Sequence, residues 1–173
     1  YLIEFKDGKA LSPLKAKGKI NKTGTFINFL PSRDVFSDTK FSSSILQKRM
    51  RELAFLNKGL SIILIDKTGK KEKEYKNKYD GGIQEFVDFL DKNKEILVNK
   101  NDLGLFKKPI YISGLKTNVE VECALKWNAG YSEEMLPFAN NIHQKDGGTH
   151  LLGFRSALTR VINKYAIDGN FLK

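Results

Sequence analysis

The chain has 173 residues, a formal net charge of +10 and a hydrophobic content of 40%, a globular composition that excludes fibrous and disordered classes. Its longest apolar run, residues 60–65, is far shorter than the roughly 18 residues that span a bilayer, so we expect a soluble protein without a membrane partner. One cysteine excludes an internal disulfide, which favours a reducing, cytoplasmic location. Because the chain starts with Tyr1 at a strand-like segment, we expect it to be a fragment.

The positive charge comes mainly from lysine. There are 25 Lys and 5 Arg, and the excess of Lys together with frequent Asn and Ile is typical of an AT-rich coding bias. The net charge is therefore weak evidence for a nucleic-acid partner. The arginines are better indicators of specific interactions: Arg33, Arg49, Arg51, Arg155 and Arg160.

The first half of the chain has the pattern strand, strand, helix, strand, strand. Alternating or continuous apolar residues predict strands over four segments: residues 1–5, 23–32, 60–66 and 72–79. Between the second and third of these, the apolar spacing predicts a helix over 44–57. Ser44 followed by Gln47 predicts a capping box at the start of this helix.

The second half begins after Asp80-Gly81-Gly82, where the composition changes. A short helix is predicted from residue 83, a loop over 99–108, a hairpin over 110–127, a third strand over 135–142 and a long helix from Thr149. Alternation along the hairpin predicts that Cys123 faces the core. Thr149 is expected to cap the long helix, whose apolar stripe is expected to be deeply buried: Leu151, Phe154, Leu158, Val161, Ile162 and Tyr165. The predicted fold class is α+β, rich in antiparallel strands.

No residue pattern indicates catalysis by itself. Glu133 and Glu134 are adjacent, and His143 and His150 lack a nearby nucleophile or the spacing of metal ligands. The two glycines of residues 146–150 open a helix that could hold phosphate, but an ordinary turn explains them equally well. The residues alone therefore predict neither a catalytic site nor a metal site.

Longer motifs carry a resemblance that these single residues do not. They are TGTFINFLPS (23–32), RELAFLN (51–57), FANNI (138–142) and DGGTHLLGFRSALTR (146–160). In this order they resemble the B subunits of bacterial DNA gyrases, with the homologous subunit of topoisomerase IV as the close alternative. Pro137 and extra residues over 99–107 depart from the family pattern.

The resemblance implies a division into two domains. Residues 1–80 would be the C-terminal portion of a GHKL-type ATPase sandwich, and residues 81–173 an incomplete transducer domain similar to domain 2 of ribosomal protein S5. The full-length protein would use ATP and Mg²⁺ for DNA strand passage and negative supercoiling. Its partners would be DNA, the A subunit of gyrase and a second B subunit. The catalytic base, the magnesium ligand and the Gln-Thr-Lys loop would lie outside this segment, so the fragment alone is expected to be inactive and without a bound cofactor.

The resemblance also implies roles for three residues. Thr25 would lie beside the adenine in the nucleotide and aminocoumarin pocket, whereas the residue pattern alone suggests only a β-branched strand residue. Arg155 and Arg160 would face DNA, with an intramolecular ion pair as the alternative for Arg155. A different class of protein stays open, namely a free-standing basic S5-like module that binds nucleic acid.

Overall fold

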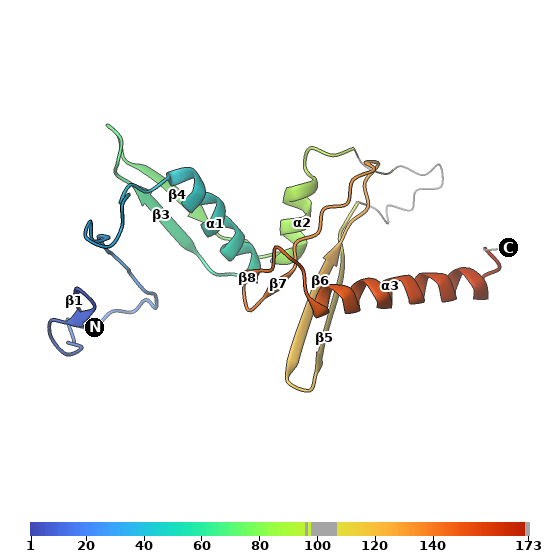
Figure 1. Cartoon of the computed structure of the whole chain (residues 1–173), viewed down its shortest axis with the longest axis horizontal. Helices are drawn as coiled ribbons and strands as arrows, with labels where there is room; N and C mark the ends of the chain where they lie inside the picture. Colours follow the sequence, from blue (N-terminus) through green and yellow to red (C-terminus); the bar gives the residue numbers. More distant parts are fainter. Residues whose placement is uncertain (96, 98–106, 172–173) are drawn as a thin grey trace. The chain divides into compact units, whose positions relative to one another are not determined.

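The computed structural model describes residues 1–95, 97 and 107–171. Helices and antiparallel strand pairs are mixed along the described part of the chain (Figure 1), which confirms the α+β prediction. The chain divides into two compact units, Tyr1–Ser43 and Ser44–Lys173.

The first unit contains one small hairpin. Strands β1 (Phe5–Lys6) and β2 (Lys9–Ala10) pair around Asp7 and Gly8, whose φ angles of 51° and 77° form the tight turn. The strand predicted over 1–5 is therefore displaced toward this turn. The strand predicted over 23–32 is wrong, because residues 22–32 form no strand and Phe26 is 89% exposed. A strand requires a neighbouring backbone to pair with, and no described segment supplies one here.

The second unit starts with helix α1 (Ser43–Leu56), followed by the antiparallel strands β3 (Ile62–Asp66) and β4 (Lys73–Asn77). These elements confirm the predicted helix and hairpin. The capping box is wrong at Gln47, whose side-chain amide donates to Asn77 Oδ1 at 3.2 Å while its own Oε1 is buried without a partner. Asn77 is only 1% exposed, so this buried amide holds the Gln47 side chain away from the start of the helix.

An aromatic cluster forms the core between α1 and α2 (Ile83–Asp91). The ring of Phe55, which is 1% exposed, stacks on Tyr79 at 3.6 Å and on Phe86 at 4.7 Å between centroids. Gly82 stands at the N-cap position of α2 with a positive φ of 60°, a backbone conformation that favours glycine. The stacking of Phe55 on Phe86 connects residues before and after 80–82. The predicted boundary between two domains at residues 80 and 81 remains a prediction.

The predicted hairpin is confirmed as β5 (Ile110–Lys116) and β6 (Val119–Leu125). The half near the turn is exposed, with Val119 61% and Val121 57% exposed, although both residues follow the same alternation as Cys123. Helix α2 contacts β6, and half-buried residues begin only at Cys123 (Figure 1). The predicted loop over 99–108 lies outside the described residues except for its last two positions.

The segment predicted as a third strand is instead a second small hairpin. Strands β7 (Phe138–Ala139) and β8 (Ile142–His143) flank Asn140 and Asn141, whose φ angles are 48° and 66°. Asparagine tolerates the left-handed conformation that this tight turn requires, so the chain reverses where the apolar pattern predicts continuation.

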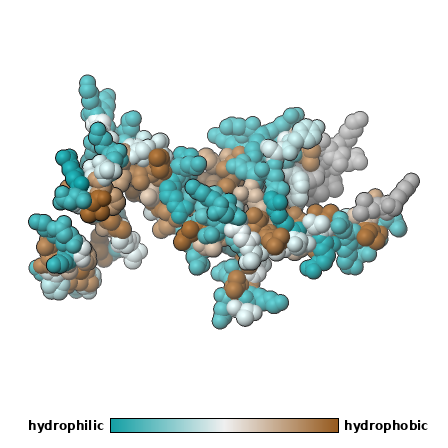
Figure 2. Space-filling view, viewed as in Figure 1, coloured by the Kyte–Doolittle hydropathy of each residue, from teal (hydrophilic) through white to brown (hydrophobic). Residues whose placement is uncertain are grey.

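Helix α3 (Thr149–Asp168) is confirmed, but its predicted cap and burial are wrong. Gly148 occupies the N-cap position with no side-chain cap bond, and Thr149 is the first helical residue. No residue of α3 is buried, and Val161 and Tyr165 of the stripe are 62% and 69% exposed. A 3.6-residue period creates an apolar face, but burial also requires an element that packs against it. Apolar residues accordingly remain visible at the surface (Figure 2).

No helix in the described part of the chain combines the length and apolar composition needed to cross a membrane.

Candidate nucleotide and nucleic-acid sites

Thr25 lies in the irregular segment of the first unit and is exposed. Its hydroxyl is the only polar group that its side chain offers to a ligand. Thr25 is not among the residues that line the pocket described in this unit, which comes from the later segment 33–40. The role of Thr25 in nucleotide binding therefore remains a prediction.

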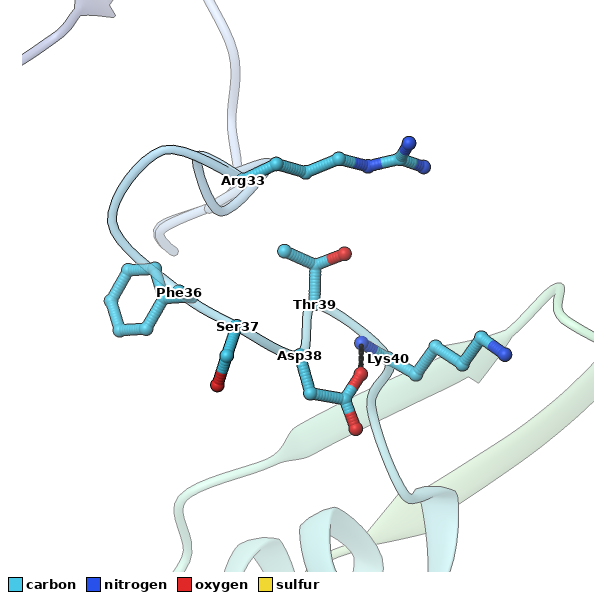
Figure 3. Close-up of a pocket in the computed structure, with 6 residues that line it drawn as sticks. All are labelled: Arg33, Phe36, Ser37, Asp38, Thr39 and Lys40. Atoms are coloured by element: carbon cyan, nitrogen blue, oxygen red, sulfur yellow. Dashed lines mark hydrogen bonds between the residues drawn. The ribbon is translucent and has the colours of Figure 1, made fainter.

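A shallow pocket forms where the chain turns after Ser32 (Figure 3). Its lining includes two cations, Arg33 and Lys40, whose side chains extend toward the same side of the loop (Figure 3). Asp38 holds the loop by accepting a 2.8 Å hydrogen bond from the Lys40 backbone N–H. The sequence analysis singled out Arg33 but did not predict the pocket, because its shape depends on the turn.

Arg155 and Arg160 both lie on α3 and are exposed, but the helix does not bring them together. Five residues at about 100° each place them on different sides of the helix. Arg155 donates from Nη2 to the carboxylate of Glu133, and the two side chains are 54% and 59% exposed. The alternative of an intramolecular ion pair is thus present in the structure, although both groups remain accessible to solvent.

A polar cluster joins α2 to the end of β6. Lys126, whose side chain is 10% exposed, lies 2.8 Å from the Asp88 carboxylate and 3.3 Å from that of Asp91. Asp91 also accepts a 2.8 Å hydrogen bond from the side chain of Asn128. The hydrogen bond to Asp88 raises the pKa of Lys126. The sequence analysis missed this cluster, because its members are distant in sequence and Lys126 looks like an ordinary solvent-facing strand residue.

A second polar network joins α1 to the β7–β8 turn. Arg49 donates from Nη2 to the backbone carbonyl of Asn141 at 2.9 Å, and from Nη1 to the Glu52 carboxylate. The side-chain amide of Asn141 donates to Asn57 Oδ1 at 3.1 Å. We call this group of Arg49, Glu52, Asn57 and Asn141 the turn clamp. Its members fall in the RELAFLN and FANNI motifs or beside them, which is the signal that could have paired them.

The other titratable residues that the structure describes show no catalytic arrangement. Partial burial raises the pKa of the Cys123 thiol, which disfavours the reactive thiolate. A hydrogen bond to Glu122 raises the pKa of Tyr111. Among the described residues, no group of three or more His, Cys, Asp or Glu side chains is placed to hold a metal ion.

Comparison with known proteins places this arrangement among the gyrases. A family model described as DNA gyrase B matches residues 82–173. The B subunit of DNA gyrase from Clostridium acetobutylicum is 46% identical over 167 residues, a match that covers 96% of this chain and 25% of that protein. The same subunit from Chlamydia muridarum is 45% identical over 177 residues, covering 100% of this chain and 21% of that protein.

Solved structures agree with the sequence matches. The 43K ATPase domain of Thermus thermophilus gyrase B, crystallised with an aminocoumarin, superimposes with a TM-score of 0.76 at 34% identity. That match covers 99% of this chain and 44% of the Thermus chain. The gyrase B subunit of Myxococcus xanthus has the same fold, with a TM-score of 0.67 at 21% identity over 91% of this chain and 42% of its own.

The fold is thus the α+β fold seen in the ATPase-domain structures of gyrase B. The chain belongs to the DNA gyrase B family. It spans about a quarter of the length of the curated relatives that it matches.

Proposed function

We propose that the chain is part of the ATP-operated clamp in the B subunit of DNA gyrase, an isomerase that couples ATP binding and hydrolysis to DNA strand passage and negative supercoiling. The main support is the superposition of 99% of the chain on the ATPase domain of Thermus gyrase B at 34% identity. The relatives at 46% and 45% identity support the same assignment.

In this proposal the described residues contact nucleotide and DNA and hold other residues in position, and they do not carry out ATP hydrolysis. Thr25 would offer its hydroxyl at the edge of the nucleotide pocket. The described residues do not fit a magnesium site, because they contain no suitable group of metal ligands. We therefore assign them no step of ATP hydrolysis.

Arg155 and Arg160 are proposed to face the DNA that the clamp encloses. Both are exposed on α3, and a guanidinium group forms forked hydrogen bonds with phosphate while keeping its charge at any physiological pH. The carboxylate of Glu133 would compete with phosphate for Arg155, since it already accepts a hydrogen bond from that side chain.

The experiment combines the full-length B subunit that contains this segment with the A subunit of gyrase, relaxed circular DNA, ATP and Mg²⁺. The proposal predicts ATP-dependent negative supercoiling that an aminocoumarin abolishes. Relaxation and decatenation without supercoiling would identify topoisomerase IV instead. Nucleic-acid binding with no change in DNA topology would favour the free-standing basic module.

A further inference from the structure

The turn clamp connects parts of the second unit that are far apart in sequence. The bond from Arg49 to Asn141 joins residues 92 positions apart, and that from Asn141 to Asn57 joins residues 84 apart. Asn141 is thus held twice, through its main chain by Arg49 in the middle of α1 and through its side chain by Asn57, the residue that follows α1.

Each bond of the clamp fixes its donor or acceptor in one orientation. The Glu52 carboxylate accepts from the second arm of the Arg49 guanidinium, so the fork cannot turn freely. Asn57 donates from Nδ2 to the Leu53 carbonyl at 2.8 Å, which leaves its Oδ1 facing Asn141. Flipping the Asn57 amide would place its oxygen against the Leu53 carbonyl, so this orientation is required.

The clamped turn leads directly into the helix that carries the two proposed DNA-facing arginines. Strand β8 ends at His143 and α3 begins at Thr149. The connection is short and internally bonded, because Gly147 N–H donates to the Gln144 carbonyl and Gln144 N–H donates to the Pro137 carbonyl, both at 2.9 Å. The position of the β7–β8 turn therefore determines where α3 starts.

We propose that Arg49 and Asn141 are positioning residues that hold the start of α3 to α1, so that a movement of α1 is transmitted to Arg155 and Arg160. The inference rests on the proposed function, in which α1 belongs to the ATPase side and α3 to the DNA side of the clamp. Neither residue touches nucleotide or DNA in this role.

The sharpest test is Asn141→Asp in the full-length B subunit, studied in complex with the A subunit of gyrase. The substitution keeps the size of the side chain and replaces the N–H donor with an oxygen that faces Asn57 Oδ1. Asn140→Asp is the matched control, since it makes the same change in the same turn, at an exposed residue with a similar φ of 48°. Arg49→Lys forms a second arm, because lysine keeps the charge and loses the fork.

For each variant we measure the kcat and KM of ATP hydrolysis, the supercoils introduced per ATP, the melting temperature, and hydrogen exchange of the amides of residues 152–156. Asn141→Asp and Arg49→Lys are expected to keep ATP hydrolysis within about twofold, and to lower supercoils per ATP by roughly 2- to 30-fold. The amides at the start of α3 should exchange faster than in wild type, whereas Asn140→Asp should match wild type in every readout.

Two outcomes would overturn the role of the turn clamp, and a third would overturn the proposed function. Supercoils per ATP and exchange that are the same in Asn141→Asp and Asn140→Asp would overturn the clamp and leave the proposed function intact. A parallel loss of ATP hydrolysis, supercoiling and melting temperature would show a merely structural contact and would also overturn it. A wild-type protein without ATP-dependent supercoiling would instead overturn the proposed function, and the transmission with it.

Discussion

Arg155 has two competing partners at the scale of single residues, the Glu133 carboxylate and the proposed DNA phosphate. Because both side chains are more than half exposed, the ion pair is screened by solvent and contributes little to folding. We expect Arg155→Gln in the full-length protein to weaken strand passage, with an unchanged melting temperature. The logarithmic salt slope of DNA binding should fall by about one unit for each lost phosphate contact.

Glu133→Gln is the control for this prediction, because it removes the ion pair and leaves the guanidinium in place. A DNA-facing Arg155 requires that Glu133→Gln retain full supercoiling activity. If both substitutions lowered the melting temperature and left supercoiling normal, Arg155 would be a structural residue.

Lys126 gives a prediction about pH. Its pKa is raised above the ordinary value of 10.5, mainly by the hydrogen bond to Asp88, so the charged form is stabilised in the folded state. That stabilisation is present below pH 10.5 and is lost as the pH rises through the higher folded pKa. We expect Lys126→Met to lower the free energy of unfolding by about 2 kcal/mol at pH 8, less than for a fully buried pair because Asp88 is half exposed.

The measurement is urea denaturation of wild type and Lys126→Met at several pH values. The difference between the two proteins should stay constant from neutral pH to about pH 10 and shrink above it. A difference that disappears already at pH 8 would show that the cluster does not stabilise the charged lysine.

At the scale of elements, the aromatic cluster between α1 and α2 is expected to dominate the core of the second unit. Phe55→Ala should cost about 3–5 kcal/mol, because the ring is 1% exposed and stacks on two others. Phe154→Ala is the matched change on α3, where no residue is buried, and should cost less than about 2 kcal/mol. Equal losses in denaturation of the two variants would mean that α3 is packed as deeply as α1.

Sequence periodicity identified elements whose pattern is local. Helix α1, the β5–β6 hairpin and α3 follow from apolar spacing alone, since neighbours in the sequence determine the period. Burial could not be predicted in the same way, because it depends on partners that the period does not specify. The strand predicted over 23–32 does not form for a related reason, because no described backbone pairs with it. The turn at Asn140 was not predicted, because apolar residues on both sides of it suggested one continuous strand.

The candidate site residues show the same limit. The roles proposed for Thr25, Arg155 and Arg160 came from family motifs, whereas the contacts around these residues could be identified only in the three-dimensional structure. Glu133 has no local signal as the partner of Arg155, because the two residues are 22 positions apart. Arg49 and Asn141 are 92 positions apart, and only their place in or beside the two family motifs connects them in the sequence.

At the scale of the whole molecule, we propose that this chain is part of a clamp that ATP closes around DNA. A closed ring holds circular DNA topologically, whereas a basic surface holds linear and circular DNA alike through phosphate contacts that salt weakens. A closed clamp and a basic surface can therefore be distinguished by whether DNA binding depends on DNA topology and on nucleotide.

The most direct measurement is retention of DNA at high salt by the full-length gyrase B protein, with and without a non-hydrolysable ATP analogue. If the proposed clamp exists, circular DNA is retained only when the analogue is present, and cutting the circle releases it. Retention that is equal for linear and circular DNA, independent of nucleotide and lost at high salt, would contradict the clamp and indicate a basic nucleic-acid-binding module.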